Sequence, residues 1–248
     1  MPSFLKQLQL PFDVSPTAAA PGRPHQVRLA GGIFGYRLVR ARRRSVALCV
    51  GTDGIEVRAP RHATLAEIEN FIRLKEPWIR KRLAEPRRQP FVWEAGASLP
   101  WLGETLTLAL QPDRTGANFS GGLLELGLAD GSSPRERGLA WMRDRALEFF
   151  RERCEVLASP LGLHVSAVGL SNARTRWGSC SAGGRVLLNW RLMMMPARLV
   201  DYVVAHELAH LRELNHSARF WEVVGALYPD YRSARRELNE FSRTLPEL

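Results

Sequence analysis

Three histidines near the C-terminal end constrain the fold more than any other feature of the sequence. The chain has six histidines, and His206, His210 and His216 all fall within eleven residues. Residues four apart lie on one face of a helix, so His206 and His210 point toward a common position. Glu207 follows the first histidine, where a carboxylate can reach metal-activated water without binding the metal itself. The chain must therefore form a helix here and then turn back.

The third histidine determines where that helix ends. A catalytic zinc ion usually has three protein ligands and one open position. His216 lies six residues after His210, so we expect the helix to end sharply near Leu214. Asn215 tolerates the left-handed conformation of a helix C-cap and is expected to adopt it.

A second helix is expected directly after this turn, over residues 218–228, with Ser217 as its N-cap. Glu222 on that helix is an alternative third ligand, because glutamate takes this place in other zinc proteases. The spacing favours His216. The sequence thus predicts a Zn²⁺ site made of His206, His210 and His216.

Composition limits the class of protein. The chain has 248 residues and a formal net charge of +10, which favours weak, non-specific attraction to nucleic acid or nucleotides, although a solvated basic surface is the simpler interpretation. Cys49, Cys154 and Cys180 lack paired spacing, which indicates a reducing compartment. No window approaches the roughly 20 apolar residues that span a bilayer. We therefore expect a cytoplasmic protein without a membrane partner; the oligomeric state is not predicted.

The organisation along the chain is expected to have three parts. Residues 1–32, rich in Pro and Ala, are predicted to be a flexible tail, and order is expected to begin near Ile33. Residues 33–130 are predicted to be strand-rich, and residues 131–248 to form the catalytic core. The sequence shows no internal repeat. Expected strands cover residues 36–40, 45–50, 55–59, 99–103, 105–110 and 123–128.

Two helix starts are predicted by capping boxes, in which Ser or Thr is followed three residues later by Glu. Thr64 with Glu67 begins one helix, and Ser133 with Glu136 begins a long amphipathic one. In the core, residues 175–180 and 185–191 are expected to pair as a hairpin. The open edge of that hairpin is a candidate shelf for an extended peptide.

Three motifs together resemble a known family. They are Arg174–Ser181 (RTRWGSCS), Leu188–Leu192 (LNWRL) and His206–Trp221 (HELAHLRELNHSARFW). They strongly resemble the YgjP-like metallopeptidase family, which is related to the SprT-like zinc metalloproteases. Segments 40–45 and 75–79 add to the resemblance, which covers roughly residues 33–245.

The resemblance implies an α+β protein, in which a strand-rich N-terminal region precedes a zincin-like core with a small antiparallel sheet packed on the active-site helix. It also implies that His206, His210 and His216 hold zinc and that Glu207 is the catalytic acid/base. The histidine spacing also matches the metzincin proteases. Those have glycine where this chain has Glu213, and the methionine turn that they carry is not found here.

The predicted function is hydrolysis of peptide bonds in a peptide or unfolded protein by metal-activated water. Arg174, Arg176, Asn189 and Tyr228 are candidates to stabilise the oxyanion, and the sequence does not choose among them.

Two alternatives stay open. A metal-dependent nucleoside triphosphate pyrophosphohydrolase, an activity also attached to the family, would use Arg174, Arg176 and Arg191 on the phosphates. Against this, the chain has no glycine loop that cradles phosphate, and three histidines suit zinc better than magnesium. The second alternative is a DNA-associated protease, which the positive charge and the SprT-like relatives favour.

Overall fold

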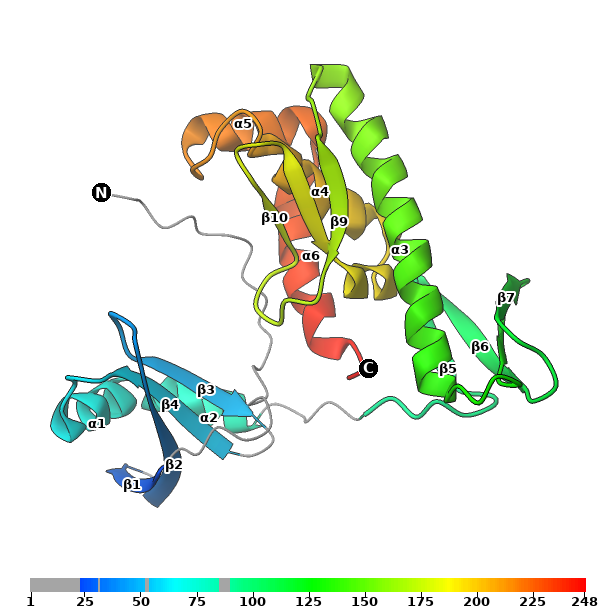
Figure 1. The fold of residues 1–248 in the computed structure, drawn as a ribbon. Coiled ribbons are helices and arrows are strands. Elements are labelled where there is room, and N and C mark those ends of the chain that lie inside the picture. The colour runs from blue at the N-terminus through cyan, green and yellow to red at the C-terminus, as the bar shows by residue number, and fades with distance from the viewer. Residues whose placement is uncertain (1–22, 31, 52–53, 85–89) are drawn as a thin grey trace. The chain divides into compact units, whose positions relative to one another are not determined.

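The computed structural model describes residues 23–30, 32–51, 54–84 and 90–248 (Figure 1). These residues divide into two compact units, one within residues 23–84 and one within residues 90–248. The α+β class is confirmed, because the described residues form six α-helices and three small sheets. The division falls near residue 87, whereas the sequence led us to expect one near residue 130.

The N-terminal unit is a four-stranded sheet with two helices. Its strands have the order β1-β2-β4-β3, in which β1–β2 and β3–β4 are antiparallel pairs and β2–β4 is a parallel pair. β1 lies in the segment predicted to be a tail, and it is ordered because all seven of its residues pair with β2. The elements are β1 (Arg23–Leu29), β2 (Gly32–Ala41), β3 (Ala47–Gly51), β4 (Gly54–Pro60), α1 (Leu65–Leu74) and α2 (Glu76–Ala84).

The C-terminal unit begins with a second four-stranded sheet of the same topology. Its order is β5-β6-β8-β7, again with two antiparallel pairs and a parallel central pair, β6–β8. No sequence repeat accompanies this topological repeat. The strands are β5 (Ser98–Trp101), β6 (Glu104–Gln111), β7 (Ala117–Ser120) and β8 (Leu123–Gly127).

The turn between β5 and β6 joins this sheet to the rest of the C-terminal unit. The Leu102 N–H donates a hydrogen bond of 2.7 Å to the Met193 carbonyl. Beside it, a Cβ on Gly103 would lie 3.3 Å from the Pro196 Cα, and Gly103 has a φ of +95°. The turn is therefore packed against the chain that leads into the histidine helix.

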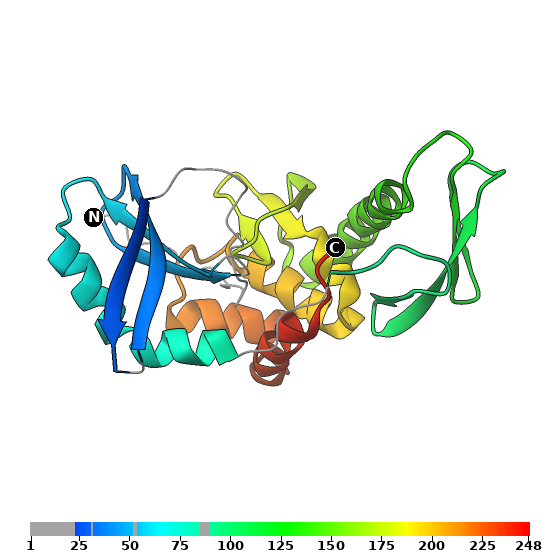
Figure 2. The same ribbon diagram turned by 90° about the horizontal axis from the view of Figure 1, so that it is seen from below.

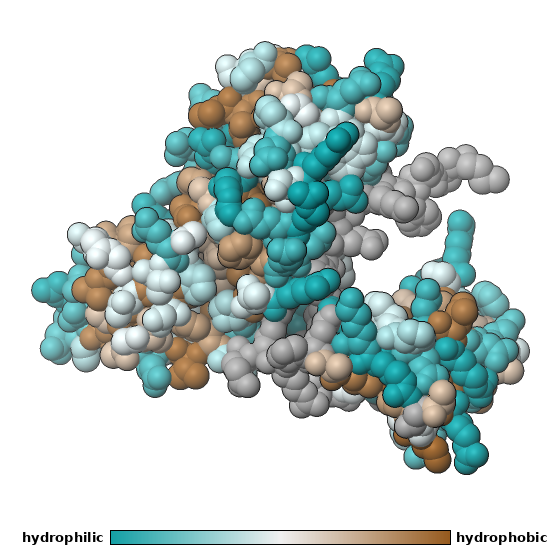
Figure 3. All heavy atoms as spheres, turned by 180° about the vertical axis from the view of Figure 1, so that it is seen from behind, coloured by the Kyte–Doolittle hydropathy of each residue, from teal (hydrophilic) through white to brown (hydrophobic). Residues whose placement is uncertain are grey.

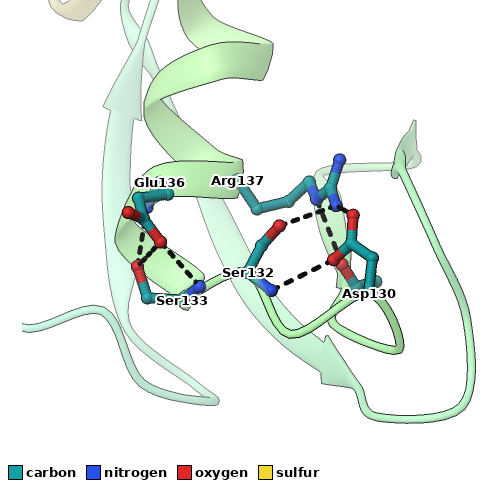
Figure 4. Close-up of polar contacts among 6 residues, drawn as sticks. Asp130, Ser132, Ser133, Glu136 and Arg137 are labelled. Atoms are coloured by element: carbon teal, nitrogen blue, oxygen red, sulfur yellow. Dashed lines mark hydrogen bonds and ion pairs between the residues drawn. The ribbon is translucent and has the colours of Figure 1, made fainter.

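The long helix α3 (Pro134–Ala158) follows β8 and begins as its capping box predicts. The Glu136 N–H donates to the Ser133 hydroxyl at 3.2 Å, and the Ser133 N–H donates to the Glu136 carboxylate at 3.0 Å (Figure 4). Arg137 also bonds Asp130 and Ser132, which fixes the loop before the helix. The other capping box, at Thr64 and Glu67, is confirmed in the same way at α1.

The third sheet carries the predicted hairpin. β10 (Gly178–Cys180) and β11 (Arg185–Asn189) are antiparallel, and β9 (Ala167–Ser171) pairs with β11 in parallel. The expected antiparallel pair is present, and β9 adds a parallel strand, so the sheet as a whole is mixed. After β9 the chain passes through a loop into β10 and then returns as β11, which lies between the other two strands. The strand order is therefore β10-β11-β9, and β10 lies at an edge of the sheet.

The histidine helix lies at the centre of the unit (Figures 1 and 2). α4 (Ala197–Ala209) contacts α3, β10, β11, η2 (Trp190–Met194), α5 (Ala218–Leu227) and α6 (Tyr231–Thr244). A short helix, η1 (Ser159–Leu161), follows α3. Arg153 donates two hydrogen bonds, of 2.6 and 3.1 Å, to the Asp201 carboxylate and so joins α3 to α4.

The surface of the described residues is mixed. Figure 3 shows hydrophobic side chains scattered among hydrophilic ones on the face that it presents. Within the described part of the chain, no helix combines the length and the apolar composition that crossing a membrane requires.

Replacing Ser133 by alanine is expected to destabilise the protein by about 1 kcal/mol, because an N–H at the start of α3 loses its acceptor. Urea unfolding measures the change. The Ser133→Asp variant keeps an N-cap acceptor and should lie close to wild type. Equal stability of all three proteins would contradict the role given to this cap.

Candidate metal centre

The helix that carries the first two histidines ends earlier than predicted. α4 ends at Ala209, with His210 as its C-cap, and the expectation of a helix to Leu214 was wrong. Asn215 is not left-handed either, because Leu102 is the one non-glycine residue with positive φ among those described. The chain reverses through hydrogen bonds to the last helical carbonyls instead, including those from the Leu211 and Glu213 N–H groups to Leu208 and Ala209. Because several short turns end the helix, no single capping residue in the sequence indicates where it ends.

This reversal brings the three histidines together. Candidate ligand atoms of His206, His210 and His216 all lie within 4.8 Å of one another. The Nε2 atoms of His206 and His216 are 3.1 Å apart. Two nitrogens bound tetrahedrally at about 2.0–2.1 Å from one ion would be roughly 3.3 Å apart. The separation therefore suits two ligands of a single metal ion.

The ring of His210 is oriented by the turn that follows α4. His210 Nδ1 lies 3.1 Å from the Glu213 carbonyl, so Nδ1 carries the proton and donates it. His210 Nε2 then carries the free lone pair, and this atom is buried without a hydrogen-bond partner among the described residues. A backbone carbonyl that fixes the tautomer of a histidine is the usual support of a metal ligand.

The next helix closes the site with aromatic rings. The Ser217 hydroxyl accepts a bond from the Phe220 N–H at the start of α5, as the sequence predicts for this cap. The Phe220 ring lies 4.5 to 4.9 Å from the three histidine rings, measured between centroids. Trp221 lies beside His206 and His216, at 5.9 and 6.0 Å. The cap at Ser217 therefore positions the wall of the site.

Glu207 is fully buried, and neither of its carboxylate oxygens has a partner among the described residues. It lies against β10, where a Cβ on Gly178 would come within 2.6 Å of both its Cγ and its Oε1. β10 can approach α4 this closely only because residue 178 has no side chain. Burial raises the pKa of Glu207 to about 8, and the positive charge of Arg176 opposes this rise.

The histidines are held in the neutral form that binds metals. Burial lowers the pKa of His206 well below its usual value, and the charges of His210 and His216 lower it further. Burial also lowers the pKa of His216 to about 4 and lowers that of His210. Three neutral imidazoles with inward lone pairs make a donor set that fits a metal ion.

The structure separates the other candidates named from the sequence. Glu222 is exposed and lies outside the histidine cluster. Asn189 is fully buried, and its Nδ2 donates to the carbonyls of Ala173 and Arg176, so this amide is not free to bind an oxyanion.

Cys180 is not in a disulfide bond. Burial raises its pKa to about 12, and the charge of Glu207 contributes to the rise. It therefore stays protonated near neutral pH and is outside the histidine cluster.

Sequence analysis missed several residues around the site. Tyr202 is buried one helical turn before His206, with the two rings 6.3 Å apart. The Arg235 guanidinium lies 5.1 Å from the centre of the Trp221 ring. The i−4 spacing could have identified Tyr202, whereas Arg235 is on α6 and reaches the site only through the fold.

Comparison with known proteins identifies the class. The sequence profile described as YgjP-like, metallopeptidase domain, matches residues 44–241. The chain therefore belongs to the YgjP-like family of metallopeptidase domains.

Two further comparisons were made. A search of the curated proteins finds no match. Among solved structures, the crystal structure of the metallopeptidase zymogen of Pyrococcus abyssi abylysin is similar, with 21% identity, a TM-score of 0.34, and coverage of 40% of this chain and 99% of that chain.

The Gly178→Ala variant is expected to lose about 1–3 kcal/mol of stability, because the new methyl group overlaps the Glu207 carboxyl. Gly183→Ala is the matched control, since its nearest neighbour would be the Ser181 hydroxyl at 4.0 Å. Urea unfolding should separate the two variants. If both lost the same amount, the close approach of β10 to Glu207 would not be the cause.

Proposed function

We propose that the protein is a zinc-dependent metallopeptidase in which His206, His210 and His216 bind the metal and Glu207 is the general base. The observation that carries this proposal is the convergence of three neutral imidazole lone pairs beside a buried carboxylate that has no partner. Three nitrogen donors suit zinc, whereas magnesium prefers oxygen ligands. Family membership supports the same chemistry.

In this proposal Glu207 is the general base of peptide hydrolysis. Bound zinc would supply Lewis acidity that polarises the scissile carbonyl and lowers the pKa of the attacking water. Glu207 takes a proton from that water as it adds to the carbonyl carbon. It then delivers the proton to the leaving nitrogen as the C–N bond breaks. Burial by α4 and Gly178 keeps the carboxyl from pairing with other groups of the chain.

The open edge of β10 is the proposed shelf for the substrate backbone. Trp177 and Ser181 bond inward to β11, through Asn189 N–H to Trp177 O at 2.8 Å and Ser181 N–H to Arg185 O at 3.0 Å. Backbone groups alternate in direction along an antiparallel strand, so those of Gly178 and Cys180 face the open edge. A peptide paired there would pass beside Glu207.

Zinc analysis and activity together test this proposal. Wild-type protein and the Glu207→Gln variant should bind equal amounts of zinc, because Glu207 is not a ligand. Wild type should cleave casein, and the variant should lose about 10²- to 10⁴-fold of that rate. Hydrolysis of nucleoside triphosphates, lost in the variant while casein stays intact, would contradict the peptidase proposal in favour of a pyrophosphohydrolase.

The choice of the third ligand has its own test. His216→Ala should lose most of the bound zinc, since two nitrogens hold the ion much less firmly than three. Glu222→Gln should bind zinc as wild type does, because the side chain of residue 222 is exposed and outside the cluster. Zinc loss in the glutamine variant, with retention in the alanine variant, would make Glu222 the ligand.

A further inference from the structure

Two arginines lie over Trp190, which follows β11 in the sheet that carries β10. The guanidinium carbon of Arg191 lies 4.2 Å from the centre of a Trp190 ring, and that of Arg143, on α3, lies 5.4 Å from it. Trp190 itself is only 2% exposed. We call Arg143 and Arg191 the Trp190 arginine cluster.

Hydrogen bonds fix the cluster in place. The Asn172 side-chain oxygen accepts from Arg191 Nη1 at 2.8 Å and from Trp190 Nε1 at 3.2 Å. The Asn189 amide holds the neighbouring loop through the Ala173 carbonyl at 2.7 Å. The guanidinium of Arg191 is therefore oriented by neutral groups.

Arg143 and Arg191 bring two positive charges to the Trp190 ring. No ion pair joins Arg143 or Arg191 to a carboxylate in the part of the chain that the structure describes. Burial, followed by the charges of Arg174 and Arg143, lowers the pKa of Arg191 to about 10. Arg135 lowers it further, and Glu247 is the one carboxylate that acts against this. Like charges held together in this way favour binding of an anion.

A short loop connects the cluster with the metal centre. Residues 172–177 join β9 to β10, and the Asn189 amide bonds the carbonyls of Ala173 and Arg176 within it. Within this loop, the charge of Arg174 acts on Arg191 and the charge of Arg176 acts on Glu207. The loop leads directly to Gly178, which touches Glu207.

The strand direction determines which part of a substrate would meet these arginines. β10 runs from Gly178 to Cys180, away from the loop. A peptide in antiparallel pairing with β10 would run the opposite way, from Cys180 toward Gly178 and then along the loop. Its residues after the bond that faces Glu207 would therefore approach the cluster.

We propose that the Trp190 arginine cluster is a subsite that binds carboxylate groups in the part of a peptide substrate that follows the scissile bond. This inference rests on the proposed peptidase function and names the substrate class: peptides that are acidic after the cleaved bond. Arginine suits carboxylates because its planar group offers paired donors. A nucleic acid is the weaker choice, because the indole is buried and offers no face on which a base could stack.

Binding and cleavage by the full, zinc-loaded chain test the proposal. Labelled peptides of one length, with glutamates or glutamines at the same positions, are titrated into the Glu207→Gln variant, which binds without turnover. The acidic peptide should bind about tenfold more tightly, and adding Arg191→Gln or Arg143→Gln should remove most of this preference. Arg151→Gln, the same charge change at an exposed residue of α3, is the control and should keep it.

Cleavage by the otherwise wild-type chain then locates the preference. With the cleaved bond mapped by mass spectrometry, glutamates placed after it should lower KM, and Arg191→Gln should raise KM about tenfold for these peptides while leaving kcat and neutral peptides nearly unchanged. An effect of glutamates only before the bond would overturn the assignment.

The remaining outcomes are also decisive. Equal binding of acidic and neutral peptides, or a preference that Arg151→Gln weakens as much as Arg191→Gln, would overturn the subsite. Tighter binding of a single-stranded oligonucleotide, lost in Arg191→Gln, would overturn the peptide assignment in favour of a polyanion. If the wild-type chain bound acidic peptides through Arg191 but cleaved none of them, the peptidase function would be contradicted and the binding subsite would stand.

Discussion

The burial of Glu207 against Gly178 is the constraint on which the rest of the proposed site depends. A carboxylate without a partner is costly inside a protein, and here it has two neutral histidine neighbours on the same helix. The helix stays in place because its other residues form the core between α3, α5, α6 and the sheet. Hydrophobic packing of α4 thus keeps the Glu207 carboxyl and the histidine rings buried, although burial of such polar groups is unfavourable by itself.

The polar atoms that lack partners are concentrated at this site. Ten buried side-chain atoms have no hydrogen-bond partner among the described residues, and five belong to His206, Glu207, His210 and His216. Buried polar groups in proteins are nearly always satisfied, so such a concentration marks a place that binds something. A metal ion and its water would satisfy His210 Nε2 and the Glu207 carboxylate, whereas the Nδ1 atoms of His206 and His216 belong to rings whose Nε2 atoms are the ones that meet. At Trp190, Arg143 and Arg191 likewise have no ion pair with a carboxylate among the described residues.

Local patterns predicted most of the elements that build the site. The capping boxes, the β10–β11 hairpin and the Ser217 cap involve residues close in sequence, and each is found where the pattern placed it. The spacing of the histidines likewise predicted that they would meet. The end of α4 was wrong by several residues, because a series of backbone turns reverses the chain where a left-handed cap was expected. The Phe220 wall, the contact with Gly178 and the position of Arg235 depend on tertiary packing, which no local pattern contains.

X-ray absorption at the zinc edge of the purified protein tests the central claim most directly. It reports the type and distance of the atoms around the metal without relying on activity. The account predicts one zinc ion per chain, with three imidazole nitrogens at about 2.0–2.1 Å, a further oxygen and no sulfur. A zinc–sulfur distance near about 2.3 Å would place Cys180 or another thiol in the site, and a protein that binds no zinc would contradict the metal centre itself.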